Sequence, residues 1–212
     1  MRPVVQTFIA SDADYICVSQ TRGSAGALVI NGVGKDLNSA LPRVVFPGDF
    51  ARVVSITSDG TDNDIDFTVT GYSITGAAIS ETLTGPSSAT VQTTALFAIV
   101  TGVSISAATS GNITVGIGST GASNWVQHDT FQNPFLIDGV FDIATTIDYS
   151  VFSTPDNPNV TASPYSIAWA AGVTGATADQ VSSLAVPRWG SRVVINSSSG
   201  SGALTATFRQ AG

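Results

Sequence analysis

The densest group of side chains that could do chemistry is acidic. Four carboxylates occur within one short segment, at Asp59, Asp62, Asp64 and Asp66, and carboxylate oxygens are ligands that Ca²⁺ prefers. Their spacing is not that of an EF-hand loop, and Asp, Asn and Gly are also the residues that a tight turn needs for its own backbone. We therefore interpret the segment as a turn first and as a Ca²⁺ site second, and predict no cofactor.

The residues that could act as nucleophile or base are few. The chain has one histidine, His128, and one cysteine, Cys17. A Ser-His-Asp or Cys-His unit would need His128, and no G-x-S-x-G motif accompanies it. Cys17 lies in an apolar alternating stretch, where a thiol behaves as a small buried hydrophobe. One cysteine cannot form an intramolecular disulfide, so no oxidising compartment is indicated. The prediction is a protein that is not an enzyme.

Three tryptophans raise an alternative function. Trp125, Trp169 and Trp189 could form a platform for sugar rings, as in a carbohydrate-binding module. Large aromatic residues also supply much of the burial in small β domains, so we favour packing for all three. A glycosidase would need two carboxylates that converge on a cleft, and no such pair stands out, because the remaining Asp residues are spread singly along the chain.

Composition narrows the class of protein further. Only 11% of the 212 residues are charged, against roughly 25% in a typical globular chain. There are 26 Ser and 25 Thr, but Lys35 is the only Lys and Glu81 the only Glu, so a mainly helical fold is excluded. A net charge of −7 without a basic stripe argues against nucleic-acid binding. No apolar run approaches the ~20 residues of a membrane span, so no membrane partner is expected.

Alternation of apolar and polar residues predicts strands along nearly the whole chain. The clearest case is 64–70, where every second residue is apolar. The strand 51–57 precedes it, and the turn between them predicts a β-hairpin. The chain then turns back through Thr75 and Gly76 into a further strand, which makes a meander.

Two later segments repeat this plan. Strand 97–105 with 112–117, and strand 189–195 with 203–208, are predicted as hairpins. Arg-Val-Val stands at Arg52 and again at Arg192, and each time a turn leads into an alternating strand. We infer an internal duplication. The predicted fold class is all-β, with two tandem antiparallel β-sandwich or barrel-like domains related by that duplication.

Composition also predicts the domain boundaries. The Gly- and Ser-rich stretch 118–123 has the composition of a linker. The predicted parts are therefore an N-terminal arm of residues 1–11, a first β domain of residues 12–121 and a second β domain of residues 122–212.

The N-terminal arm is the predicted interface. It is short and mainly apolar, and an exposed sheet edge can accept a strand from a neighbouring chain. The interface residues are therefore predicted to be Val4, Val5, Phe8 and Ile9.

Seven segments of the chain together form a further pattern. They are Arg52–Gly60, Ile65–Gly71, Gly76–Pro86, Ala25–Gly32, Val100–Ile105, Ile147–Pro158 and Ala206–Gly212. This pattern resembles that of tailed-bacteriophage virion structural proteins, and the resemblance covers about residues 12 to 212. Ala77 stands where Asn is commoner in those proteins.

This resemblance implies a component of the virion and no catalytic residues. The expected role is a capsid decoration or cement protein that bridges subunits of the major capsid protein. We expect it to form a symmetric homo-oligomer, a trimer in the first instance, after synthesis in the bacterial cytoplasm. A neck or tail component, such as a tube or collar subunit, is the alternative. A surface with few charges suits either role, because it buries area without stranding ions.

Overall fold

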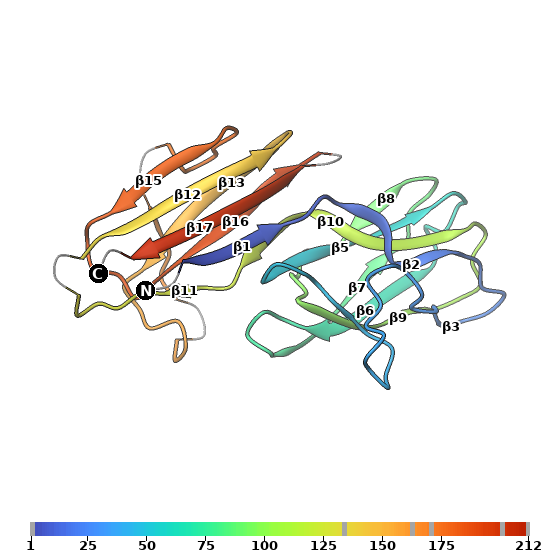
Figure 1. Cartoon of the computed structure of the whole chain (residues 1–212). Coiled ribbons are helices and arrows are strands. Elements are labelled where there is room, and N and C mark those ends of the chain that lie inside the picture. The colour runs from blue at the N-terminus through green and yellow to red at the C-terminus, as the bar shows by residue number, and fades with distance from the viewer. Residues whose placement is uncertain (1–2, 133–134, 162–163, 170–171, 200–201, 211–212) are drawn as a thin grey trace. The chain divides into compact units, whose positions relative to one another are not determined.

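The chain is all-β, as predicted, in a computed structural model that describes residues 3–132, 135–161, 164–169, 172–199 and 202–210 (Figure 1). Within these residues it contains 17 strands and no helix. Accordingly, the described part of the chain has no helix long and apolar enough to cross a membrane.

The chain forms two compact units. Unit 1 contains Met1–Ala10, Pro47–Phe50 and Ser119–Gly212, and unit 2 contains Ser11–Phe46 and Ala51–Gly118. The chain passes from one unit to the other several times, because the short segments Met1–Ala10 and Pro47–Phe50 belong to unit 1.

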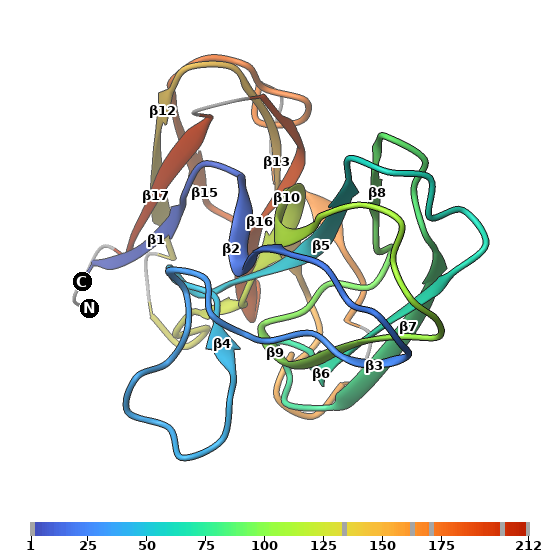
Figure 2. The ribbon, with the colours of Figure 1, turned by 90° about the vertical axis from the view of Figure 1, so that its right-hand side faces the viewer.

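Unit 1 is built from two layers of antiparallel strands, seen from two directions in Figures 1 and 2. The first layer has, in spatial order, β1 (Val4–Phe8), β17 (Ala203–Gln210), β12 (Ile137–Ala144) and β15 (Gln180–Leu184). The second has β14 (Ile167–Ala168), β13 (Ile147–Thr154) and β16 (Gly190–Ser198), with β11 (Val126–Gln127) and the end of β10 (Ile113–Ser123) beside β16.

Aromatic side chains fill the space between these layers. Phe141, Trp169 and Phe208 form the centre of the cluster: the Trp169 ring stacks on Phe208 with centroids 5.2 Å apart, and Phe141 meets Trp169 edge-on at 5.8 Å. Phe208 reaches this position because β17 alternates, so that every second side chain points inward.

Unit 2 also has two groups of strands. One group contains β10, β5 (Phe50–Ser58), β8 (Thr90–Gln92) and β2 (Asp12–Gln20). The other has the order β3 (Gly26–Ala27), β9 (Ile99–Ile105), β6 (Asp66–Tyr72) and β7 (Ala78–Thr84), with β4 (Val44–Val45) beside β9. The buried side chains come from both groups, as in Ile56 on β5 and Phe67 on β6.

The predicted return strand after Gly76 is confirmed. β6 and β7 pair antiparallel from Asp66 opposite Thr84 to Tyr72 opposite Ala78. Gly76 closes the turn with φ 80, a backbone conformation that favours glycine.

The three other predicted hairpins are wrong. β5 pairs with β8 and β10, and it does not pair with β6. The strands β9 and β10 belong to different sheets, and so do β16 and β17. The sequence pattern correctly predicts each strand of these hairpins. It carries no information on the neighbouring strand, and a connection of several residues can cross to the opposite layer as easily as it can close a hairpin.

The prediction that residues 118–123 form a linker loop is also wrong. Residues 118–123 form the second half of β10. The strand continues because small residues fit where other chain segments approach closely. A Cβ added at Gly118 would lie 2.4 Å from a Val53 methyl carbon.

Candidate functional site

The most exposed apolar side chains of unit 2 lie on one long connection, which we call the 28–43 loop, between β3 and β4. The loop extends away from the strands of unit 2 (Figure 2). Val33, Leu37 and Leu41 are 79%, 87% and 74% exposed. Since soluble proteins rarely gather exposed aliphatic side chains without a partner, this loop is a candidate interaction site.

The base of the 28–43 loop is anchored to β2. The N–H groups of Gly32 and Gly34 donate to the carbonyls of Ile16 and Tyr15, each at 2.9 Å. Gly34 is required by close approach, because an added Cβ would lie 2.1 Å from the Tyr15 ring. The position of the loop therefore depends on its hydrogen bonds to β2 and on the glycine at position 34.

The tip of the loop is closed by an ion pair. Arg43 contacts Asp36 at 2.7 Å, and the Asp36 N–H donates to the Arg43 carbonyl at 2.9 Å. The pKa of Asp36 is lowered, because the Arg43 side chain and the Asn38 N–H both donate to its carboxylate. Leu37 and Leu41 lie between Asp36 and Arg43 in the sequence. The loop therefore presents both leucines in a defined arrangement, and it does not have to become ordered when a partner binds.

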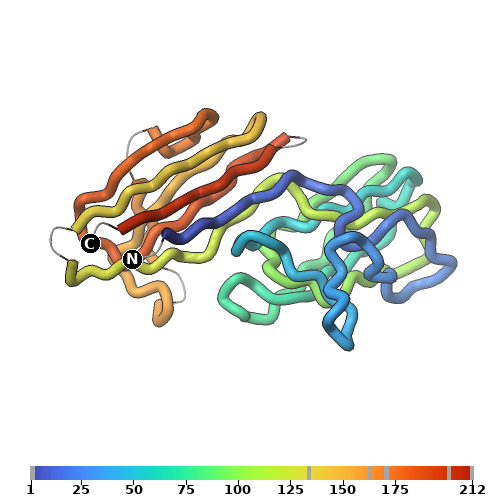
Figure 3. The backbone as a smooth tube through the Cα atoms, in the orientation of Figure 1, coloured from blue at the N-terminus to red at the C-terminus, as the bar shows by residue number. Residues whose placement is uncertain are grey.

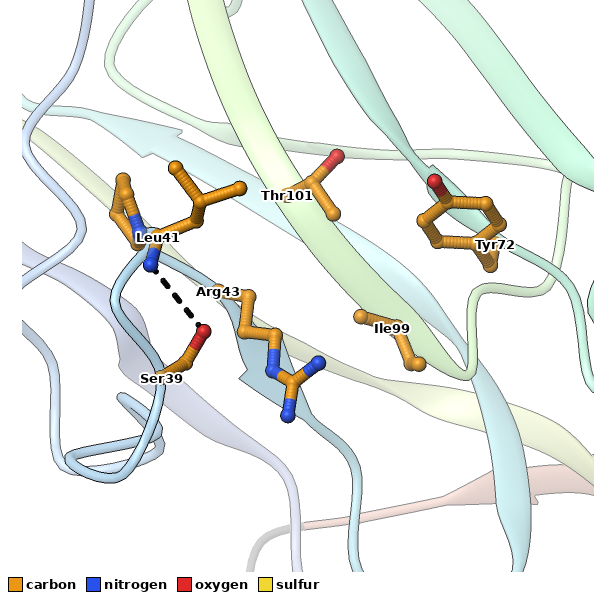
Figure 4. A pocket seen from close by; sticks show the side chains of 7 residues that line it. Ser39, Leu41, Arg43, Tyr72, Ile99 and Thr101 are labelled. Atoms are coloured by element: carbon orange, nitrogen blue, oxygen red, sulfur yellow. Dashed lines mark hydrogen bonds between the residues drawn. The ribbon is translucent and has the colours of Figure 1, made fainter.

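A hollow of about 420 Å³ lies beside the loop (Figure 4). Leu41 and Arg43 border it on the loop side, Ile99 and Thr101 come from β9, and Tyr72 comes from β6. It is further lined by Ser39 and Pro42. The hollow offers apolar surface with hydroxyl and guanidinium groups at its margin, a combination that suits a protruding side chain of a partner.

The acidic segment is used internally. Asp62 is fully buried and accepts hydrogen bonds from the Ser58 hydroxyl and from the Ser110 N–H, and Asp59 accepts from Asn112. Burial raises the pKa of Asp62, but the donors from Ser58 and Ser110 outweigh it and the net pKa is lowered.

These hydrogen bonds occupy the carboxylate oxygens of Asp59 and Asp62 that a metal ion would need as ligands. Asp64 and Asp66 are exposed, and no group of three or more acidic, His or Cys side chains that could hold a metal occurs among the described residues. The turn interpretation therefore accounts for Asp59 and Asp62, and binding of Ca²⁺ by Asp59, Asp62, Asp64 and Asp66 stays a prediction without a formed site.

His128 and Cys17 are both buried. His128 Nε2 lies 2.8 Å from the Ser191 hydroxyl, and burial lowers the pKa of His128 to about 4. Burial also raises the pKa of the Cys17 thiol to about 12, so the reactive thiolate is scarce at neutral pH. Both side chains therefore have the surroundings of structural groups.

The three tryptophans do not share one surface role. Trp169 is buried in the core of unit 1. Trp125 packs under Arg192, whose guanidinium carbon lies 4.6 Å from the ring centroid, and Trp189 is 38% exposed. Trp169 is thus unavailable as a sugar platform, which weakens the carbohydrate-binding alternative.

The predicted N-terminal interface residues lie on and beside β1, which runs along β17 (Figure 3). Phe8 is fully buried and meets Phe50 edge-on at 5.3 Å. Val5 is 54% exposed, and Val4 and Ile9 are half-buried. In the single chain Val5 is therefore the member with the most surface to offer, and the role of Val4, Val5, Phe8 and Ile9 in contacts between chains stays a prediction.

Sequence reasoning missed the 28–43 loop. Its apolar residues at positions 33, 37 and 41 recur every four residues. This spacing is not the strict alternation of a strand, and it attracts no notice in a chain with many apolar residues. The available signal was their place between Gly, Asn, Asp and Pro, which favours a loop.

Comparison with known proteins identifies no relative: no protein-family model matches the chain, and no curated protein is significantly similar to it.

Proposed function

We propose that this chain is a non-enzymatic structural protein of a tailed-bacteriophage virion, and that it decorates and stabilises the head by bridging subunits of the major capsid protein. The observation that carries the proposal is the 28–43 loop, which holds Leu37 and Leu41 in water between the closing residues Asp36 and Arg43. A preformed apolar loop of this kind is suited to insert into a partner surface.

Two further features support a role in assembly. Only 11% of the residues are charged, so large areas can be covered by a partner at a small desolvation cost. The resemblance of the sequence to phage virion proteins suggests the major capsid protein as that partner, and self-association into a trimer would multiply each weak contact.

The finer architecture that we propose is two domains related by duplication. Arg52 on β5 and Arg192 on β16 each begin an Arg-Val-Val segment. Each of these strands is followed in the chain by a strand of another sheet, β6 and β17. The proposal of a common origin of the two halves rests on this repeated segment.

Particles of the phage that encodes this chain provide the test. Quantitative mass spectrometry of purified particles should find the protein at a copy number comparable to that of the capsomers. A few copies per particle would instead support the neck or tail alternative. Absence from every particle would contradict a virion role.

The loop is tested in the same particles with the double substitution Leu37→Asp and Leu41→Asp. We expect at least tenfold weaker binding, since burial of each leucine contributes about 1.5–3 kcal/mol and about 1.4 kcal/mol corresponds to a factor of ten. Asn38→Asp is the matched control, because it adds charge to the same loop without removing an apolar side chain. Unchanged occupancy of the double variant would remove the loop from the mechanism.

A further inference from the structure

A row of three valines and one threonine, which we call the apolar row, crosses the outer face of the four-stranded sheet of unit 1. The strand register aligns Val5 with Thr207, Thr207 with Val140, and Val140 with Val181, so one residue of each strand contributes. Val5 and Val181 are 54% and 75% exposed, and the two central residues are half-buried. The opposite face of the same strands carries the core, so this row faces away from it.

Charged residues flank the apolar row on both sides. On one side Arg209 of β17 stands opposite Asp138 of β12, and both are exposed. On the other side Asp142 of β12 stands opposite Thr205 of β17. The described part of the chain shows an ion pair at Asp36 and Arg43 and none between Asp138 and Arg209.

We propose that this face binds the same face of a second copy of the chain, about a twofold axis that is parallel to the strands and lies between β17 and β12. Rotation about this axis places each cross-strand row of one copy opposite the same row of the other copy. It also places β17 of one copy opposite β12 of the other. Arg209 of each copy then lies opposite Asp138 of the other, and Val140 lies opposite Thr207. The face is therefore complementary to itself, as an interface with twofold symmetry requires.

The charges exclude the other face-to-face arrangement. A twofold axis perpendicular to the strands, through the apolar row, would exchange the two flanking rows. Asp138 of one copy would then approach Asp142 of the other, and apposed like charges oppose association. The axis parallel to the strands avoids this contact and gives two attractive ones, in an aligned packing of two sheets.

The size of the face predicts a weak dimer. β1, β17, β12 and β15 contain 5, 8, 8 and 5 residues. At ~3.3 Å per residue and ~4.8 Å between strands, the sheet offers about 400 Å² per copy in plan, below the roughly 800 Å² per partner of a standard stable interface. We therefore expect association that depends on concentration and that gains strength where many copies are held side by side. This twofold contact is separate from the proposed trimer, since an interface with twofold symmetry closes with two copies, and it does not depend on a capsid.

Charge reversal tests both the partner and the axis. In a dimer of the Arg209→Asp variant, both charged contacts place two acidic side chains opposite each other. In a dimer of the Asp138→Arg variant, both contacts place two basic side chains opposite each other. Each variant alone should self-associate at least about tenfold more weakly than the wild type in sedimentation equilibrium. An equimolar mixture should recover dimers containing one chain of each variant, because every charged contact is again between opposite charges.

Asp14→Arg is the control, since it makes the same change in charge as Asp138→Arg on the exposed surface of β2 in unit 2. It should leave association unchanged, and circular dichroism of all variants checks folding. A wild type that is monomeric up to millimolar concentration, or variants whose mixture fails to associate, would overturn the inference. A dimer that never joins a particle would contradict the proposed function instead, so the two failures are distinguishable.

Discussion

At the residue scale, burial decides what the ionisable side chains can do. Arg52 is 1% exposed, burial lowers its pKa to about 10, and its guanidinium donates to the Gly118 carbonyl. It stays charged at neutral pH and supports β10 from β5. Asp62 is likewise committed to donors from Ser58 and Ser110. Groups whose types suggest chemistry thus serve as internal polar connections.

His128 predicts a pH dependence of stability. Burial lowers its pKa in the folded protein to about 4 from an ordinary 6.5, although a hydrogen bond with the Gln127 backbone partly opposes this. Between these pH values the unfolded chain binds more protons than the folded one, so the free energy of unfolding falls as the pH is lowered. The expected loss is roughly 3 kcal/mol between pH 7 and pH 4.

Urea titration of the wild type and of His128→Gln measures this effect. The wild type should lose stability between pH 7 and pH 5, where the carboxylates are still charged, and the variant should be nearly insensitive to pH in that window. Equal slopes for the two proteins would show that His128 is not the group responsible.

At the element scale, β1 combines two roles on its two faces. Its inward side chains, including Phe8, complete the core of unit 1, while Val5 faces outward. An alternating strand of five residues is enough for this separation, because successive side chains point to opposite faces.

Substitutions on β1 should separate the two roles. Phe8→Ala should lower the free energy of unfolding by about 3–5 kcal/mol, since it removes a fully buried ring that packs on Phe50. Val5→Ala should change it by no more than about 0.5 kcal/mol, because the side chain is exposed. Chemical denaturation of both variants provides the comparison. A small effect of Phe8→Ala would indicate that β1 is not part of the stable fold.

At the scale of the whole molecule, the path of the chain ties the two units together. Unit 1 takes residues from the N-terminus, from Pro47–Phe50 and from the C-terminal half. Phe8 and Phe50 are therefore distant in sequence from most of the core that they complete. Such connections make folding depend on contacts of long sequence separation.

A fragment tests this dependence. Residues 119–212 alone lack Phe8 and Phe50, and we expect them not to unfold cooperatively by circular dichroism. Residues 3–10, added after residue 212 through a short Gly-rich linker, should increase the stability, because β1 pairs antiparallel with β17 from Val4 opposite Phe208. A cooperative transition for the shorter fragment would show that the second predicted domain folds without the arm.

Composition and alternation were sufficient to predict an all-β chain, several of its strands, such as β6 and β17, and the burial of Cys17. These properties are local, because a period of two assigns each side chain to a face of its strand. Apart from the pairing of β6 with β7, the neighbours of the strands came only from the tertiary structure, as did the exposure of Leu37 and Leu41 and the alignment of Val5 with Val181. They depend on contacts between segments far apart in the chain, which no local pattern encodes.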